Sequence, residues 1–410
     1  MADHTADRKD AEAGSGPGHV LDHTDAGPEP SPTGRKQRSR PIPGEKTRDG
    51  LRAGTPWGTP PGTRPRCGPA TASGAGLLGG PSARTLGLLA AVALLAAVAL
   101  ASVLIGYQRL TLEELHLAYA GYTGSDTDLV ARHLRVPRTL AGLFVGAALG
   151  VAGVLVQGVT RNPLGDPGLL GINAGAALAA VIAISVFGTT ALLGYVGFAF
   201  AGAALAACVV YTVGSLGPDG ASPVKLALAG AAISAMLGSM TSAIVLQERA
   251  TLDEYRFWVV GSLVGADSTS LPQALPFLAA GLVLAVALAR PLNVVALGDE
   301  LAWSLGTRLW LVRTSSAVAV VLLAGTATAL AGPIGFVGVA VPHIARVLVG
   351  PDHRWLLPWS AVLAPLLLLV ADIVGRLVVR PEELQVGIVT ALIGAPFFIL
   401  LVRRRKVAGL

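Results

Sequence analysis

Three arginines stand at the ends of two apolar runs, where their side chains could bind carboxylate groups. Arg135 and Arg138 open an apolar run of about 20 residues, long enough to cross a bilayer as one helix. Arg376 closes another run, four residues after Asp372 and on the same helix face. A planar guanidinium offers donors in a fork that fits a carboxylate. Two plainer interpretations stay open here: the arginines reach to the membrane interface, or Asp372 and Arg376 form an ion pair at a helix end.

Hydrolysis of ATP would require a phosphate-cradling loop of the type G-x-x-x-x-G-K-[ST], in which a lysine directly follows a glycine. None of the lysines in this chain follows a glycine: they are Lys9, Lys36, Lys46, Lys225 and Lys406. The sequence shows no catalytic constellation of another kind. We therefore predict that the chain is not an enzyme, uses no cofactor, and depends on a separate polypeptide for any ATP hydrolysis.

Residues that commonly bind metals are few and scattered. Cys67 lies in the N-terminal region and Cys208 within an apolar run, so they predict neither a disulfide framework nor a metal site. His343 follows Pro342 and has no cysteine, aspartate or second histidine beside it. A structural role fits His343 better than metal ligation, and we predict no metal site.

The composition is that of a membrane protein. The 410 residues are 52% hydrophobic and only 14% charged, and the mean hydropathy is +0.63. A soluble domain would carry about 25% charged residues. Apolar runs near 20 residues recur from Leu86 to the C-terminus. The sequence thus predicts an all-α polytopic membrane protein.

About ten transmembrane helices are expected from these runs. We place them near residues 84–105, 135–157, 169–187, 191–213, 224–245, 271–289, 309–331, 333–349, 356–378 and 385–402. A polar loop over 106–134, with a short surface helix, separates the first two.

An even number of spans puts both chain ends on one side of the membrane. The basic cluster at 403–406 and the arginine-rich N-terminal region predict that both termini are cytoplasmic. Arg135, Arg138 and Arg376 then fall on the outer side, against the usual bias of basic residues, and this placement asks for a function. The net charge of +6 comes from the N-terminal region and from helix ends, so we expect membrane lipid around the chain and no nucleic-acid partner.

Residues 1–82 differ from the rest. They are basic and rich in Gly and Pro and lack an apolar period, so we expect a disordered cytoplasmic tail, followed by a transmembrane permease domain over 83–405. The first apolar run begins too late for a cleavable signal peptide and is expected to act as an uncleaved anchor. A start codon other than the one assigned is an open alternative, which would require a non-AUG codon.

Three motifs within about 40 residues form a specific pattern. They are R-x-P-R-T-L over 135–140, N-P-L-x-D-P-G-L-L-G over 162–171 and N-A-G-A over 173–176. Later segments extend it: G-P-I-G-F-V-G-V-A-V-P-H-I-A-R over 332–346 and E-L-Q-V-G-I-V-T-A-L-I-G-A-P over 383–396. In these motifs and their order, residues 84–405 resemble the permease subunit of ABC importers for ferric siderophores and vitamin B12, which has the type II importer fold.

The resemblance implies three sets of functional residues. On the outer side, Arg135, Arg138 and Arg376 match the arginines that receive acidic residues of a soluble substrate-binding protein. On the inner side, the family's A-L-G-(D/E) loop inserts into a cleft of the ATPase subunit. The matching residues here are Leu297, Gly298, Asp299, Glu300, Leu305 and Gly306.

The inner constriction of the pathway is the third set. The turn formed by Asn162, Pro163 and Leu164 is a candidate. The family's cytoplasmic gate before the fifth span can carry small hydroxyl residues, and this chain has Ser222, Pro223 and Val224 there. This departure leaves the identity of the gate residues open.

Together these features predict a permease of a binding-protein-dependent ABC importer in the bacterial cytoplasmic membrane. The resemblance implies cytoplasmic ATPase subunits, an external binding protein, and a second permease that is a copy or a paralogue. It favours ferric siderophore as cargo, with vitamin B12 or haem as alternatives. An ion-coupled secondary transporter is the rival class, but it would place ionisable residues at the membrane centre, and Asp372 lies near a helix end.

Overall fold

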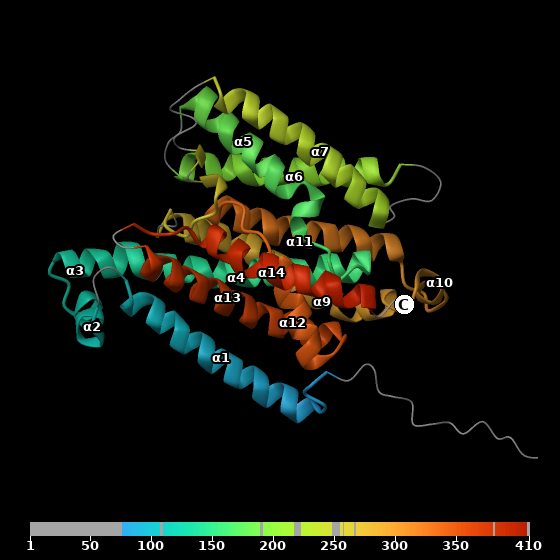
Figure 1. Cartoon of the computed structure of the whole chain (residues 1–410), viewed down its shortest axis with the longest axis horizontal. Helices are drawn as coiled ribbons and strands as arrows, with labels where there is room; N and C mark the ends of the chain where they lie inside the picture. Colours follow the sequence, from blue (N-terminus) through green and yellow to red (C-terminus); the bar gives the residue numbers. More distant parts are fainter. Residues whose placement is uncertain are drawn as a thin grey trace, which may run out of the picture. The chain divides into compact units, whose positions relative to one another are not determined.

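In the computed structural model, regular structure within the described residues is helical (Figure 1). The described residues are 76–106, 110–188, 192–216, 223–247, 255–256, 258–265, 268–379 and 382–407. Most of the expected tail over 1–82 therefore lies outside them, and that expectation stays a prediction.

Among the described residues, seven helices are long and apolar enough to cross a membrane, and three shorter apolar helices accompany them. The long helices are α1 (Pro81–Leu104), α4 (Val136–Thr160), α6 (Leu192–Gly214), α7 (Pro223–Val245), α9 (Ser270–Val295), α11 (Leu309–Ala331) and α13 (His353–Val378). The shorter ones are α5 (Ile172–Phe187), α12 (Val337–Val349) and α14 (Val386–Val407), whose apolar part is Val386–Phe397. The predicted all-α polytopic fold is confirmed.

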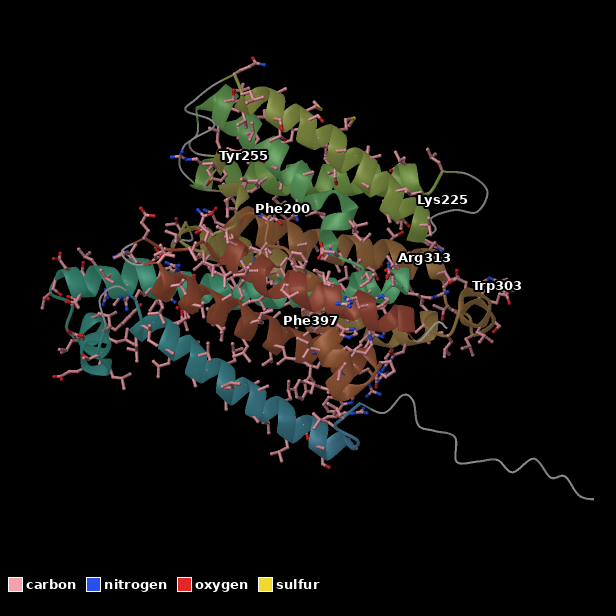
Figure 2. The ribbon with its side chains drawn as sticks, in the orientation of Figure 1. Phe200, Lys225, Tyr255, Trp303, Arg313 and Phe397 are labelled. Carbon is pink, nitrogen blue, oxygen red and sulfur yellow. The ribbon has the colours of Figure 1, made fainter. Side chains whose placement is uncertain are left out.

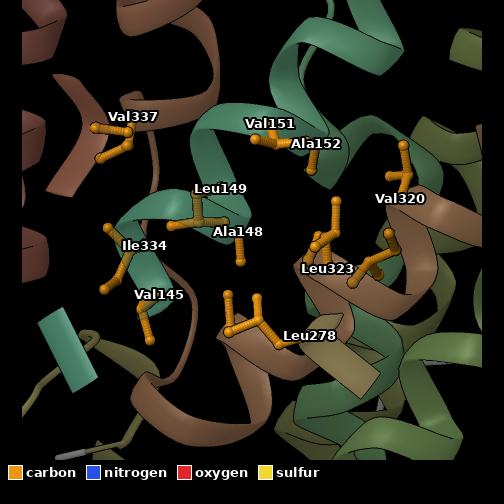
Figure 3. Packing of buried hydrophobic residues seen from close by; sticks show 14 of the residues in the cluster. Val145, Ala148, Leu149, Val151, Ala152, Leu278, Val320, Leu323, Ile334 and Val337 are labelled. Atoms are coloured by element: carbon orange, nitrogen blue, oxygen red, sulfur yellow. The ribbon is translucent and has the colours of Figure 1, made fainter. Parts of the chain in front are cut away.

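The central helix is α4, which packs against α13, α11, α12 and α9. In the part of the core drawn in Figure 3, Ala148 of α4 lies beside Leu278 of α9, and Ala152 lies beside Leu323 of α11. Three glycines of α4 lie against neighbouring backbones: a Cβ on Gly146 would meet Pro365, one on Gly150 would meet Ser360, and one on Gly153 would overlap the carbonyl oxygen of Gly338. Small residues permit this approach, and close packing holds helices together in lipid.

The other helices surround this core. Helices α5, α6 and α7 pack on one another, and α1 packs mainly along α13 (Figure 1). Between α1 and α4 the chain forms two short helices, α2 (Leu112–Ala120) and α3 (Asp126–Leu129), and a π-helical turn over Val130–Arg135. The predicted surface helix in this loop is present as α2, which begins with a capping box between Thr111 and Glu114.

Two helices begin later than the sequence predicted. The span expected from 169 begins at Ile172, because Asp166 caps a 3-10 turn and Gly171 adopts a left-handed conformation with φ 74°. The span expected from 333 begins at Val337, because Gly332 and Phe336 are left-handed, with φ 70° and 67°. A left-handed phenylalanine is uncommon and costs backbone strain.

A first prediction concerns the backbone contact of Gly153. Gly153→Ala should lower the melting temperature of the detergent-solubilised protein, because overpacking of this kind typically costs about 1–3 kcal/mol. The matched control is Gly197→Ala in α6, where a Cβ meets nothing within 4 Å. Both changes raise intrinsic helix propensity by about 1 kcal/mol. Equal melting temperatures for the two variants would contradict the close approach of α4 and α12.

Candidate functional site

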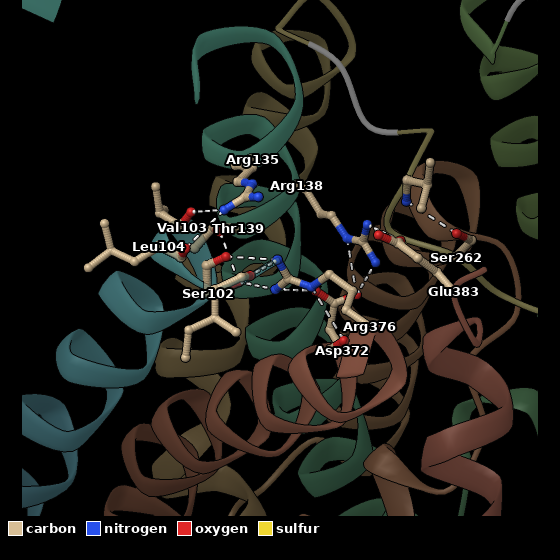
Figure 4. Close-up of polar contacts among 12 residues, drawn as sticks. Ser102, Val103, Leu104, Arg135, Arg138, Thr139, Ser262, Asp372, Arg376 and Glu383 are labelled. Atoms are coloured by element: carbon tan, nitrogen blue, oxygen red, sulfur yellow. Dashed lines mark hydrogen bonds and ion pairs between the residues drawn. The ribbon is translucent and has the colours of Figure 1, made fainter. Parts of the chain in front are cut away.

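The three predicted arginines gather where α1 ends and α4 begins (Figure 4). Arg135 is only 7% exposed, and its Nη1 donates to the carbonyl oxygens of Val103 and Leu104, each at 3.0 Å. These carbonyls belong to the last turn of α1, where the helix itself supplies no donors. Arg135 therefore caps the C-terminal end of α1 and meets the negative end of its dipole.

Arg376 caps the same helix end from the other side. It is 4% exposed, and its Nη1 donates to the carbonyl oxygens of Ser102 and Ile105 at 2.9 and 2.8 Å. Its Nη2 donates to the Ser102 hydroxyl, which also accepts from Thr139 at 3.0 Å. Arg135 and Arg376 are thus buried caps of a transmembrane helix. This role could not be predicted from the sequence, because the capped carbonyls belong to the backbone.

Arg138 contacts two carboxylates, one buried and one partly exposed. Its Nε and Nη2 donate to Oδ1 of Asp372 at 3.1 and 2.7 Å, and its Nη1 donates to Oε2 of Glu383 at 2.6 Å. Asp372 is fully buried and also pairs with Arg376 at 2.9 Å, four residues away on α13. The side chain of Glu383 is 37% exposed. The helix-end ion pair inferred from spacing is present, while the link from Asp372 to Arg138 spans 234 residues and has no local signal in the sequence.

All three arginines line one cavity, which we call the arginine cavity. It has a volume of about 450 Å³, and its lining consists of Gly106, Val130, Leu134, Arg135, Arg138, Val264, Arg376 and Glu383. Three guanidinium groups and one carboxylate therefore face this cavity at the start of α4. Its lining suits an incoming carboxylate.

At the other end of α4 lies the segment predicted to contact the ATPase. Gly298 and Gly306, with φ of 117° and 77°, flank the short helix α10 (Asp299–Ser304). Its two large apolar side chains point outward, and Trp303 is 78% exposed (Figure 2). Leu297, Leu301 and Leu305 are exposed as well. A cluster of exposed apolar side chains is typical of a protein-binding surface.

Asp299 ties α10 to two other elements. Its Oδ1 pairs with Arg161, which directly follows α4, and its Oδ2 pairs with Arg313 of α11 at 2.8 Å. Partial burial raises the pKa of the Asp299 carboxyl, but Arg313 and Arg161 outweigh burial and hold this pKa below its ordinary value. Arg161 also donates from Nε to the carbonyl oxygen of Val295 at 3.0 Å and has a left-handed backbone with φ 48°. Glu300, the neighbouring acid, begins α10 beside Asp299.

The predicted constriction residues are only partly described. Asn162 accepts a hydrogen bond from the Leu164 amide at 3.0 Å, which closes the turn around Pro163. This turn follows Arg161 and is therefore joined to α10 through Asp299. Ser222 lies outside the described residues; Pro223 begins α7, and Val224 is 69% exposed. The gate assignment stays a prediction.

The described residues include no group of three His, Cys, Asp or Glu side chains that could hold a metal ion. His343 lies on α12 with its ring centroid 5.9 Å from that of Phe397 on α14, in an edge-on arrangement. This packing is the kind of contact expected of a structural histidine.

Comparison with known proteins identifies the family of this chain. The profile of the FecCD transport family matches residues 94–404. The chain belongs to the FecCD transport family. This assignment and the apolar helices make it a multi-pass membrane transport protein.

Individual relatives agree with the family. The chain is 46% identical over 309 residues to the ferric enterobactin transport system permease protein FepD of Escherichia coli (strain K12), covering 75% of this chain and 92% of FepD. It is 39% identical to the cobalamin import system permease protein BtuC of Halobacterium salinarum, covering 68% and 74% of the two chains. A solved metal-chelate type ABC transporter in an inward-facing conformation superposes with a TM-score of 0.69 at 28% identity, covering 78% of this chain and 99% of that chain.

The buried charges of this FecCD-family chain generate a second prediction. Asp372→Ala should destabilise the protein by about 3–5 kcal/mol, because it leaves two buried arginines without their shared carboxylate. Glu383→Ala should cost about 1 kcal/mol or less, because its ion pair is partly solvated. Thermal unfolding in detergent measures both changes. Similar losses for the two variants would contradict the difference in burial between the two carboxylates.

Proposed function

We propose that this chain is the permease subunit of a binding-protein-dependent ABC importer that carries a ferric siderophore across the bacterial cytoplasmic membrane. The observation that carries the proposal is the position of two unlike surfaces at opposite ends of α4. The arginine cavity suits acidic groups, and α10 presents apolar side chains for a protein partner. An importer that receives cargo on one side and energy on the other requires both surfaces.

On the outer side, the arginine cavity receives acidic residues of a substrate-binding protein. Arg138 is the arginine best suited to direct contact, because Arg135 and Arg376 already cap α1. The latter two keep the cavity positive and hold α1 in place. A second permease, identical or paralogous, would present the same cavity to the other lobe of the binding protein.

On the cytoplasmic side, separate ATPase subunits bind α10. Leu301 and Trp303 supply apolar anchors, and large exposed aromatic side chains often dominate the affinity of such interfaces. Asp299 then carries the movement of α10 to Arg161 and the turn after α4. This turn is the proposed inner constriction, so the ion pairs of Asp299 link ATP-driven movement to the pathway.

The pathway itself lies between two permease copies. Apolar side chains on α7 and α14 are exposed in the single chain, among them Leu228, Met236, Leu392 and Ile399. A large chelate needs a wide and mostly apolar route, and these faces provide one. The name of FepD supports ferric enterobactin-type cargo, while the name of BtuC keeps cobalamin as the alternative cargo for the same machinery, with haem a further option.

Uptake by a bacterial strain that lacks the gene for this protein tests the proposed function. Radiolabelled ferric enterobactin and ferric hydroxamate are compared with radiolabelled cobalamin and with haem. We expect loss of iron uptake alone, restored by the wild type and not by Trp303→Glu. Loss of a central aromatic anchor of about 2 kcal/mol should reduce ATPase binding and uptake by roughly tenfold or more.

Leu112→Glu is the matched control, since it also places a carboxylate on an exposed apolar position. Leu112 belongs to α2, which lies near the start of α4 and therefore at the end of α4 opposite α10. It should leave uptake unchanged. Loss of cobalamin uptake alone would change the cargo and keep the mechanism. Uptake that survives removal of the ATPase but collapses with a protonophore would establish an ion-coupled carrier instead.

A further prediction concerns the ion pairs of Asp299. Arg161→Gln should lower the amount of chelate transported per ATP by about fivefold in proteoliposomes, the lower end of the usual range for coupling between two sites, while the ATPase remains bound. Because the folded-state pKa of Asp299 is lowered, its ion pairs stabilise the protein above the unfolded value of about 3.9 and are lost only as pH falls through the folded value. The effect therefore applies at every pH used for transport.

Arg308→Gln is the control for this prediction, because Arg308 is an exposed arginine just before α11, at the same end of the bundle as Asp299. It should leave both ATPase binding and the transport ratio unchanged. Asp299→Asn combined with Arg161→Gln should be no worse than Asp299→Asn alone, because Asp299→Asn already removes the pair with Arg161 as well as the pair with Arg313. Additive losses would show that the two residues act separately.

A further inference from the structure

We propose that Glu383 occupies, in the free permease, the place on Arg138 that a carboxylate of the docking protein takes when it binds. The inference rests on the proposed function, because it requires an acidic protein partner at the arginine cavity. It adds a specific exchange of partners. Nη1 of Arg138 binds the Glu383 carboxylate in the free permease and binds a carboxylate of the docking protein in the complex.

The two carboxylates on Arg138 differ in the way that such an exchange requires. Asp372 binds Nε and Nη2 of Arg138, and its side chain is 1% exposed and also pairs with Arg376. Glu383 binds only Nη1, at 2.6 Å, and its side chain is 37% exposed. Figure 4 shows the two carboxylates approaching the guanidinium from different sides. The Asp372 contact is permanent, whereas the Glu383 contact lies at the cavity and can be displaced.

The backbone around Glu383 allows its side chain to leave without unfolding the segment. The amide of the next residue, Leu384, donates to the carbonyl oxygen of Gly375 at 3.1 Å. The Gly387 amide donates to the carbonyl oxygen of Gly261 at 3.0 Å. These bonds fix the chain on the way into α14. Displacement therefore requires only a rotation of the Glu383 side chain into solvent.

The exchange also explains why an acid lines a cavity that receives acids. Without Glu383, Asp372 would still pair with Arg138, but Nη1 of Arg138 would be open to every anion in solution. With Glu383 in place, a partner carboxylate must compete for Nη1 of Arg138, so an acid that makes no other contact gains little. Only a protein that also fits the surrounding surface displaces Glu383, and the internal acid therefore contributes specificity.

Removal of the internal competitor should strengthen docking, which is the reverse of what loss of a structural contact would do. The full chain, assembled with its ATPase in lipid nanodiscs, is titrated by interferometry with the purified, ligand-loaded binding protein that supports its uptake activity. Glu383→Gln should bind about two- to fivefold more tightly than the wild type at low salt, the range expected for a partly exposed ion pair. The gain should shrink in high salt, where exposed charges are screened.

The matched control is Glu382→Gln, which removes an equal charge from the adjacent, exposed position. It should change the affinity little, so the difference between the two variants isolates the contact with Arg138. Introduction of Arg138→Gln should weaken docking and abolish the difference between Glu383→Gln and the wild type. Melting temperatures of all variants confirm that they are folded.

Three results would overturn the exchange. Glu383→Gln could bind equally or more weakly, which would show that Glu383 orders Arg138 for the partner. Glu382→Gln could bind as tightly as Glu383→Gln, which would show a general effect of charge. The gain could persist in the Arg138→Gln background. If the wild type itself did not bind the binding protein, the proposed docking function would be wrong. That result is distinguishable from the other three, in which the wild type docks.

Discussion

Contact between helix backbones is the constraint on which this structure depends. In lipid, apolar side chains gain little by leaving one apolar surface for another, so helices associate through packing and close approach. The glycines of α4 provide it: Gly146 lies against Pro365, Gly150 against Ser360, and Gly153 against Gly338. Because α13 and α12 both pack against this one face, α4 is the central helix of the bundle. Its length fixes the distance between the arginine cavity at one end and α10 at the other.

Charge inside this bundle serves two purposes at once. Arg135 and Arg376 provide the donors that the last turn of α1 lacks, and they also make the cavity beside it positive. The buried charge of Arg376 requires a partner, and Asp372 supplies it. The structural role and the proposed docking role therefore overlap at two of the three arginines. They separate at Arg138 and Glu383, where one contact is partly exposed and can be altered while the caps of α1 stay intact.

The sequence predicted the helices well because their signal is local. The span expected over 309–331 is observed as Leu309–Ala331, and apolar length alone determines it. Where the prediction missed, backbone conformation decided the outcome: Gly171 and Phe336 take left-handed conformations that delay α5 and α12. Apolar runs carry no information about such turns.

The partners of the site residues could not be predicted for a different reason. Arg138 and Glu383 are 245 residues apart, and Arg376 bonds backbone atoms of α1, which any side-chain type would present. The motifs identified the three arginines as a group, and the structure brings them to one cavity. Their docking role remains a prediction, as do the gate residues, of which Ser222 lies outside the described residues.

The capping of α1 has a consequence for how the protein is made. Helix α1 is synthesised before the other described spans, yet the carbonyl oxygen of Ile105 receives a hydrogen bond from a donor that lies 271 residues later, in α13. Until Arg376 is made, the Ile105 carbonyl oxygen lacks this donor, although the Leu104 carbonyl oxygen already accepts from the Leu110 amide and from Arg135. Insertion into the membrane and completion of the fold are therefore separate events. A nascent chain that stops before α13 therefore lacks the donor that completes this helix end.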